Sequence, residues 1–282
     1  MVPGCGAVCA WVGKIHFVTW GHLPPWLNTE HPKLNIVRHE DYIPQEYLPT
    51  FSSHPIELNL HRIQDLSEKF VYFNDDMFLT APVKPEDFFH GDTPCDTYRA
   101  NVVVPLDDKF TPILFNNVKV INRHFHKRAA LKQNFSKWVN FKYGSQNLIT
   151  LALMPWREFT GFHDEHLPNA FQKSLFETVW QQEGEILDAT CRHKFRDEED
   201  VSQYLMRYWR LAQGDFAPRS HKFGKLFVIS NDNQDLFESI LKRRYHMVCC
   251  NDTGAYEDFE LQKRRLQEVF QQAFPEKSSF ER

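Results

Sequence analysis

Long apolar runs are absent from this sequence of 282 residues, and no stretch reaches the ~20 residues that a transmembrane helix needs. No signal peptide with a small-residue cleavage site opens the chain. A basic excess is also missing, because the formal net charge is −4, and this argues against nucleic acid as a partner. Low-complexity linkers do not occur either. These absences predict one domain that has no transmembrane segment and binds no nucleic acid.

Cysteine is scarce and irregularly spaced. The six cysteines are Cys5, Cys9, Cys95, Cys191, Cys249 and Cys250. Their spacing fits neither a zinc site nor a small disulfide scaffold, which predicts a reduced, cytoplasmic chain. Cys249 and Cys250 lie in an apolar stretch, so we expect packing residues there rather than nucleophiles.

Aromatic residues, in contrast, are plentiful at 15% of the chain, with 25 Phe, so a large core can be buried. The first elements follow the order strand (14–19), loop, strand (34–39), helix (55–66) and strand (70–73), which predicts an α/β fold. Residues 1–13 differ in composition from the rest and are expected to lie outside the domain. The remaining pattern predicts short strands and loops over 83–120, a helix over 121–134, loop and helix packed on the core over 135–155, helices over 171–182 and 201–212, a strand over 226–230, a helix over 234–243, a strand over 245–250 and a helix over 256–274.

Acidic residues follow two of these strands. Asp75 and Asp76 come directly after strand 70–73 and before a second apolar stretch. A buried carboxylate needs a cation, a metal ion or a helix N-terminus to stabilise it, and an Asx turn that caps the next segment is the simpler explanation. Asn251-Asp252 ends strand 245–250 in the same way. If both strands belong to one parallel sheet, these acids converge on a crevice that suits Mg²⁺ and phosphate.

Two further clusters carry groups suited to catalysis. His163 and His166 flank two acids, and zinc binding without an evident third ligand, acid–base catalysis by one His, and a structural role all stay open. Arg196 lies in a basic cluster followed by four acids at 197–200, so it binds either a phosphate or those acids. The predicted helix over 121–134 is also basic, and a solvated face is a simpler explanation for it than a phosphate site.

Several motifs together resemble one known family. The segments that carry the likeness are Phe17-Val18-Thr19-Trp20-Gly21, Pro25-Trp26-Leu27-Asn28, Ile43-Pro44, Leu48-Pro49-Thr50-Phe51-Ser52-Ser53, Ile56-Glu57, Leu60-His61-Arg62-Ile63, Leu66-Ser67-Glu68 and the run from Phe70 to Leu79. They resemble the central block of the Stealth family, which comprises bacterial capsular polysaccharide phosphotransferases and the animal enzyme that makes the mannose-6-phosphate lysosomal tag. The resemblance places a Stealth-type domain over 14–282, with the central block over 14–120, the third block around 160–182 at His166-Leu167-Pro168, and the fourth over 226–274 at Cys250-Asn251-Asp252.

The resemblance implies a glycosyltransferase-A-like, Rossmann-like mixed sheet with helical insertions. It also implies transfer of a hexose-1-phosphate from a nucleotide-sugar donor, a UDP-sugar, to a hydroxyl of a polysaccharide or glycan acceptor in capsular or exopolysaccharide synthesis. The implied cofactor is a divalent metal, Mg²⁺, and the implied location is cytoplasmic or membrane-peripheral. The residues that match family positions are His166 as catalytic base, Asp76, Glu57 and Arg196 as further catalytic residues, Asp75 and Arg62 as donor-binding residues, and Asp76 and Asp252 as metal ligands.

One family feature has no counterpart here. The family's first block, a strand of the type Val-x-Thr-Trp-Val-Asn/Asp, matches nothing in residues 1–13. Two hypotheses therefore stand: an active phosphotransferase, or an inactive or truncated remnant that binds a nucleotide-sugar or glycan without turnover. We expect strand 15–19 to pair in the sheet beside a slot that is empty or filled by residues 1–13, with weak or no transferase activity and a tendency to self-associate.

Overall fold

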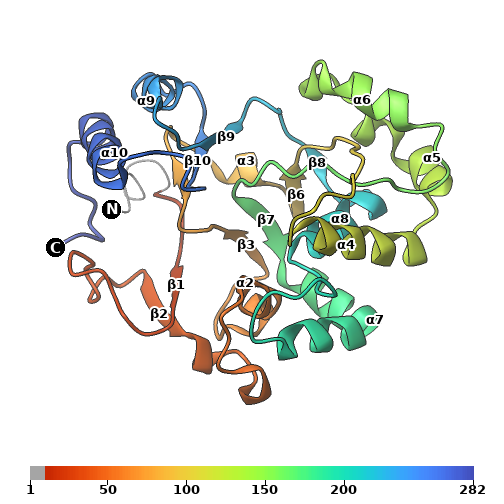
Figure 1. The fold of residues 1–282 in the computed structure, drawn as a ribbon, viewed down its shortest axis with the longest axis horizontal. Coiled ribbons are helices and arrows are strands. Elements are labelled where there is room, and N and C mark those ends of the chain that lie inside the picture. The colour runs from red at the N-terminus through yellow and green to blue at the C-terminus, as the bar shows by residue number, and fades with distance from the viewer. Residues whose placement is uncertain (1–9) are drawn as a thin grey trace.

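The computed structural model describes residues 10–282, and within them the chain forms a mixed α/β fold (Figure 1). This confirms the predicted fold class. Among these residues the strands are grouped by hydrogen bonding into four small sheets. The sheets are β1 (Ile15–Thr19) with β2 (Leu34–Arg38), β3 (Lys69–Tyr72) with β7 (Asn169–Gln172), β4 (Met77–Leu79) with β10 (Met247–Asn251) and β9 (Gly224–Val228), and β5 (Phe89–His90) with β6 (Thr93–Asp96) and β8 (Ala217–Pro218).

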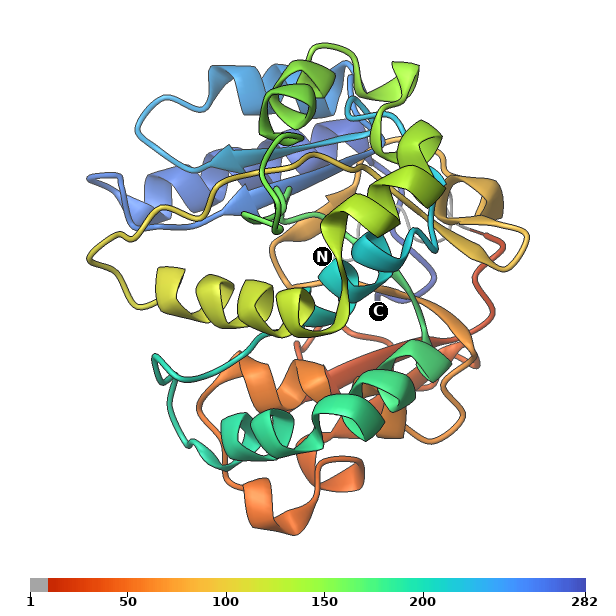
Figure 2. The ribbon, with the colours of Figure 1, turned by 90° about the vertical axis from the view of Figure 1, so that its right-hand side faces the viewer.

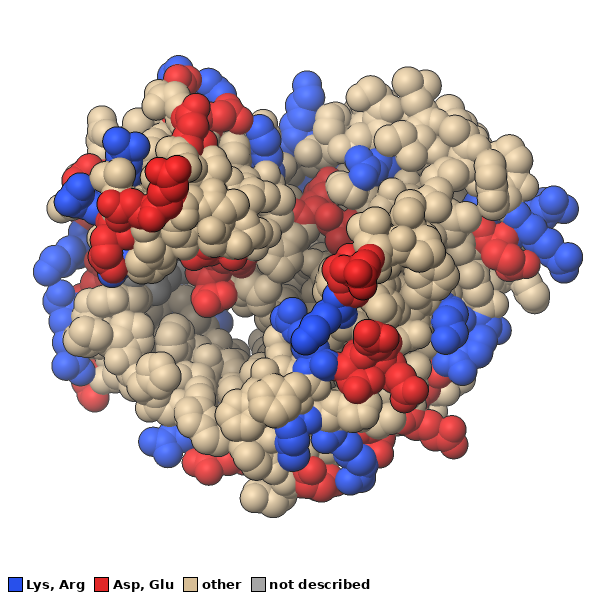
Figure 3. Space-filling model, viewed as in Figure 1, with Lys and Arg blue, Asp and Glu red and all other residues tan. Residues whose placement is uncertain are grey.

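The first sheet confirms the two N-terminal strand predictions. β1 and β2 run parallel in a register that pairs Ile15 with Leu34 and Thr19 with Arg38. The other edge of β1 pairs with no strand of residues 10–282. Figure 3 shows a narrow opening between the part of the molecule that holds β1 and β2 and the part that holds β3. The segment proposed to fill the slot beside β1 lies largely outside the described residues, so the slot stays a prediction.

The condition on which Asp75, Asp76 and Asp252 would converge, that strands 70–73 and 245–250 share one parallel sheet, is not met. β3 pairs antiparallel with β7, while β10 runs parallel to β9 and antiparallel to β4. The reason is the Asn74–Asp76 turn, after which the chain enters a different sheet as β4. The backbone N–H of Cys250 donates to the carbonyl oxygen of Asp76 over 2.8 Å, so this turn still lies against β10.

The helix expected over 55–66 is shorter than predicted and starts earlier. α2 spans Ser53–Leu58, with the Ser52 hydroxyl accepting a hydrogen bond from the N–H of His54. Asn59 ends the helix, because its side-chain amide donates to the carbonyl oxygen of Pro55 and so competes with the backbone N–H that would bind this carbonyl in a longer helix. A single 3-10 turn, Leu60–Arg62, follows.

The prediction of strands and loops over 83–120 is wrong at both ends. α3 spans Pro85–Phe88, and α4 spans Thr111–His124. The Asp108 carboxylate accepts hydrogen bonds from the N–H groups of Phe110 and Thr111, which starts α4 ten residues before the predicted helix. The chain is extended at Phe125 and His126, and α5 (Lys127–Trp138) then begins, so the single helix predicted over 121–134 is two helices.

The later elements follow the predicted order with shifted bounds. The strands predicted over 226–230 and 245–250 are β9 and β10, and the helices are α6 (Gln146–Leu153), α7 (Lys173–Arg192), α8 (Tyr204–Gln213), α9 (Gln234–Leu241) and α10 (Phe259–Ala273). The pattern missed β7, which precedes α7. Among residues 10–282, no helix combines the length and the apolar character that crossing a bilayer requires.

The elements are arranged in layers, and the buried helix α8 lies in the middle one. In Figure 2, β9, β10, α9 and α10 form one layer, β1, β2, α2 and α7 form the opposite one, and α4 and α8 lie between them. Every residue of α8 except Gln213 is buried. Two of its arginines are paired: Arg207 and Arg210 both donate to the buried carboxylate of Asp96. These two guanidinium groups outweigh the effect of burial and hold the pKa of Asp96 at about 2.

Candidate active site

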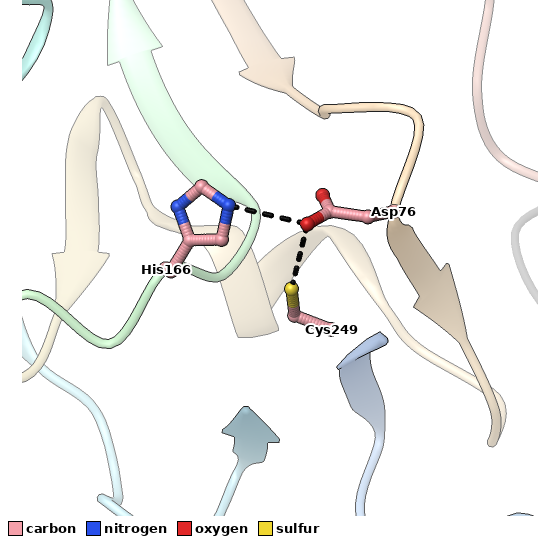
Figure 4. Close-up of side chains that lie close together, drawn as sticks. All are labelled: Asp76, His166 and Cys249. Atoms are coloured by element: carbon pink, nitrogen blue, oxygen red, sulfur yellow. Dashed lines mark hydrogen bonds and ion pairs between the residues drawn. The ribbon is translucent and has the colours of Figure 1, made fainter. Parts of the chain in front are cut away.

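Three side chains from distant parts of the chain meet at the start of β4 (Figure 4). The Nε2 atom of His166 lies 3.3 Å from Oδ2 of Asp76, and the Cys249 thiol donates to the same oxygen over 3.1 Å. Asp76 comes from the turn after β3, His166 from the turn before β7, and Cys249 from the middle of β10. The pairing of β4 with β10 brings Asp76 to Cys249, because Cys249 faces Met77 in that ladder.

His166 is held from behind by α8. Its backbone has a φ of +45°, a conformation rare for residues other than glycine. Its Nδ1 atom lies 2.9 Å from the Tyr204 hydroxyl. Arg207 secures the preceding segment by donating to the carbonyl oxygen of His163 and to Oδ1 of Asp164, each over 2.9 Å. The unusual backbone of His166 is therefore stabilised by contacts that fix where its ring points.

The Asp76–His166 pair is electrostatically coupled. Burial raises the pKa of Asp76, but hydrogen bonds from His166 and Cys249 outweigh it and leave that pKa below its usual value. The hydrogen bond to Asp76 raises the pKa of His166, against the opposing effect of burial. Each shift stabilises the charged form, so the pair tends to be an ion pair when nothing else binds there.

Glu57 supports the same turn from the side. It lies in α2, is only 7% exposed, and accepts a hydrogen bond from the Tyr72 hydroxyl over 2.7 Å. Tyr72 also contacts the side-chain oxygen of Asn74, the first residue of the Asn74–Asp76 turn. Burial raises the pKa of Glu57. Tyr72 thus links a buried carboxylate to the segment that carries Asp76.

Asp76 has the features of a cation ligand. Its Oδ1 atom is buried and accepts no hydrogen bond from any described residue. Such an oxygen is costly to leave without a partner. A hard ion such as Mg²⁺ prefers oxygen ligands, whereas His166 and Cys249 would add nitrogen and sulfur, which suit a softer metal. Burial raises the pKa of the Cys249 thiol, so its protonated form is a hydrogen-bond donor to Asp76 rather than a ligand. The free oxygen of Asp76 therefore fits a divalent cation whose other ligands are oxygens.

The remaining predicted site residues lie outside this cluster. Asp75 is exposed, and the carboxylate of Asp252 accepts from the Tyr256 hydroxyl and the N–H of Gly254. Arg62 places its guanidinium 5.0 Å from the ring centre of Trp180. Arg196 donates to the Ser53 hydroxyl over 3.2 Å and lines an open hollow with Lys109, Asp197, Glu198 and Glu199. The cluster thus brings together Asp76 and His166, with Glu57 linked through Tyr72, but not Asp75, Arg62, Arg196 or Asp252.

Two alternatives considered for these residues find no support in the contacts. Arg196 forms no ion pair with the acids at 197–200 in the described chain. Instead, Asp200 is bound by His193 and His54. His163 does not join His166 in a metal-binding group, and burial lowers the pKa of His163 to about 4.

Sequence reasoning missed Cys249, Tyr204 and Tyr72. Cys249 was expected only to pack, and its burial is complete, but its thiol also reaches Asp76. Tyr204 stands in an apolar helical pattern that gives no hint of its contact with His166. A sequence signal existed for Tyr72 alone, because it lies two residues before Asn74 in the strand that carries the acids.

Comparison with known proteins finds two matches to family models. Residues 5–96 match the model of Stealth protein CR2, conserved region 2, and residues 238–282 match that of Stealth protein CR4, conserved region 4. The first match begins nine residues before Lys14, where the sequence pattern places the start of the central block. Asp76 lies in the first matched region and Cys249 in the second, so β4 and β10 bring the two regions into contact.

Curated proteins match almost the whole chain. The chain is 44% identical over 272 residues to a capsular polysaccharide phosphotransferase WcwK of Streptococcus pneumoniae, covering 96% of this chain and 81% of that protein. It is 37% identical over 273 residues to the receptor polysaccharide phosphotransferase WefC of Streptococcus gordonii, with the same coverage. It is 36% identical over 274 residues to the exopolysaccharide phosphotransferase cps2G of Lactiplantibacillus plantarum, again covering 96% and 81%.

Proposed function

Since this chain belongs to the Stealth family, we propose that it is a phosphotransferase that moves a sugar-1-phosphate from a nucleotide-sugar to a hydroxyl of a polysaccharide acceptor. The donor is a UDP-sugar, and the product belongs to a capsular or exopolysaccharide. The observation that carries the proposal is the meeting of Asp76 and His166, which are 90 residues apart in sequence and 3.3 Å apart in space.

His166 is the proposed base. The ion pair directs a proton on Nε2 toward Asp76, and His166 acts as a base once that proton is lost, which a cation bound to Asp76 would favour. Its remaining proton then lies on Nδ1 in the hydrogen bond to the Tyr204 hydroxyl, and the Nε2 lone pair accepts a proton from the acceptor hydroxyl. The hydroxyl oxygen then bonds to the phosphorus attached to the sugar. The bond from that phosphorus to the bridging oxygen breaks, and the nucleoside monophosphate leaves with the bond's electrons. Tyr204 fixes the ring during this step, because it holds the nitrogen on the far side.

Asp76 is the proposed cation ligand, with Asp252 on the loop after β10 as a second oxygen donor. Mg²⁺, when bound, would offset the charge of the donor pyrophosphate. Arg196 is proposed to contact phosphate, and Asp75 and Arg62 to contact the donor. Glu57 acts on the site through Tyr72, because its carboxylate is buried and its hydrogen bond runs to that hydroxyl.

The reaction can be told from glycosyl transfer by its leaving group. We would incubate the purified chain with UDP-sugars, Mg²⁺ and an oligosaccharide acceptor. Phosphotransfer releases UMP and forms a phosphodiester that is visible by phosphorus NMR, whereas glycosyl transfer releases UDP. Release of UDP would overturn the proposal. Binding of the UDP-sugar in calorimetry without either product would favour the inactive remnant instead.

A further inference from the structure

The charges of this chain are unevenly distributed. Residues 109–157 contain nine Lys or Arg and no Asp or Glu, although the whole chain has a net charge of −4. The rest of the sequence therefore carries all of the acidic excess. This segment forms α4, α5 and α6, and α5 and α6 lie at the edge of the molecule farthest from α9 and α10 (Figure 1). The end of the molecule that holds α5 and α6 thus has a local excess of basic residues, with Glu158 beside Arg157 as an acidic neighbour.

Apolar side chains at this end point outward. Leu148 is 69% exposed, and Ile149 and Leu151 on the same helix, α6, are each more than 40% exposed. Phe141, just before α6, is 87% exposed, and Trp156, just after it, is 55% exposed. The surface over α6 at the upper right of Figure 3 is accordingly almost free of charge, with basic groups beside it. We call these five side chains the α6 patch.

The burial of α6 is the reverse of the usual arrangement. Its one buried residue is Thr150, whose hydroxyl accepts a hydrogen bond from the N–H of Ala100. A surface helix of a globular protein normally turns its apolar face to the core and its polar face to water. Here a polar residue fastens the helix and leucines face outward. A cluster of exposed apolar groups of this kind marks an interaction surface.

We infer that the α6 patch docks on the surface of an anionic lipid bilayer. Apolar side chains would enter the headgroup region, and an aromatic residue such as Trp156 is typical of that depth. Exposed cations of the same segment, Arg128, Lys132 and Arg157, would face the lipid phosphates, although Arg157 also lies 3.4 Å from the carboxylate of Glu158. Lys127, Lys137 and Lys142 are excluded from this set because their ammonium groups donate to backbone carbonyl oxygens.

The charge pattern favours a membrane over a second copy of the chain. In a symmetric dimer built on the α6 patch, the same basic segment would face itself across the interface, and like charges would repel. An anionic bilayer instead complements this segment. The inference stands on exposure and charge alone. It does not depend on the proposed function.

The test is binding of the chain to vesicles. We would sediment the protein with vesicles of phosphatidylcholine containing 30% phosphatidylglycerol, and separately with pure phosphatidylcholine. We expect binding to the first that falls as salt rises, and little binding to the second. L148S/L151S should weaken binding about tenfold or more, because two leucines lose their burial in the bilayer. R128E/K132E should weaken it by a similar factor.

Matched controls lie at the opposite end of the molecule. Leu241 on α9 is partly exposed, and Arg264 and Arg265 on α10 are exposed and form no ion pair with any residue of 10–282, so L241S and R264E/R265E should bind like the unaltered chain. All variants should keep UMP release with a soluble acceptor, which separates a failure of docking from a failure of catalysis. Equal loss in patch and control variants, or no binding to anionic vesicles, would overturn the inference. The inference would also be overturned if light scattering showed a dimer that the L148S/L151S substitutions convert to a monomer.

Discussion

Replacing Asp76 with Asn tests the centre of the site. The change keeps the size of the side chain and removes its charge. Oδ2 of Asp76 accepts from His166 and Cys249, while Oδ1 has no described partner. Asn can still accept one of these hydrogen bonds, and the ion pair with His166 is partly exposed, so the free energy of unfolding should fall by only about 1 kcal/mol. The melting temperature should drop by roughly 2–4 °C.

The effect on turnover should be much larger. Loss of the charge removes the proposed cation ligand and an electrostatic partner of the base, so kcat should fall by roughly 10²–10³. The pKa of His166 should fall toward its ordinary value of 6.5, because the Asp76 hydrogen bond is the main cause that raises it. UMP release gives kcat, thermal unfolding gives stability, and NMR titration of the imidazole gives the pKa.

Asp75→Asn is the matched control, because it removes a neighbouring charge that is exposed and outside the cluster. It should raise the KM for the donor more than it lowers kcat. The reasoning would be refuted by an Asp76→Asn variant that unfolds, since Asp76 would then be a structural cap. It would equally be refuted by full turnover, or by an unchanged pKa of His166.

Four further predictions follow from the same contacts. His166→Ala should lower kcat by roughly 10²–10⁴ while the donor Kd from calorimetry barely changes, and an unchanged rate would move the base to another residue. Chelation with EDTA should stop UMP release and added Mg²⁺ should restore it; full activity in the chelator would argue against a metal cofactor. Tyr72→Phe should lower stability by about 1–3 kcal/mol in urea unfolding, because Glu57 is left buried without its donor, and an unaffected midpoint would show that water replaces the hydroxyl. Asp96→Asn should lower the free energy of unfolding by roughly 3–5 kcal/mol, because the buried Arg210 loses its counter-ion and Arg207 keeps only Asp164 as an ion-pair partner. The folded pKa of Asp96, about 2, lies below its ordinary 3.8, so its stabilisation is complete above about pH 4 and is lost as the pH falls toward 2. Stability measured against pH should therefore drop in that window for the unaltered chain and less for Asp96→Asn.

Sequence alone determined the class of fold and the family. The alternation of apolar strands with amphipathic helices is a local property, so β1, β2, β9 and β10 were predicted within one or two residues. The Asp75-Asp76 motif could also be recognised in the sequence, because two carboxylates between apolar segments require a group that stabilises their charge wherever they lie. His166 and Glu57 became candidates through short motifs that can be recognised without coordinates.

Some helix boundaries were predicted wrongly because local side-chain hydrogen bonds set them. Asn59 ends α2 through its own side chain, and Asp108 starts α4 inside a stretch punctuated by proline. Apolar periodicity does not register such bonds, because they depend on the conformation of a few neighbouring atoms rather than on the spacing of apolar residues.

Only the tertiary structure decided which residues share the site. Asp76, His166 and Cys249 come from positions far apart in the chain, and their meeting depends on how β4 pairs with β10 and how α8 holds the turn before β7. Strand pairing between distant segments is set by packing of the whole core, which no short pattern specifies. The sequence therefore predicts Cys249 only as a core residue, whereas in the structure its thiol donates to Asp76. Arg62, which the family motif groups with the acids, lies over the ring of Trp180 instead.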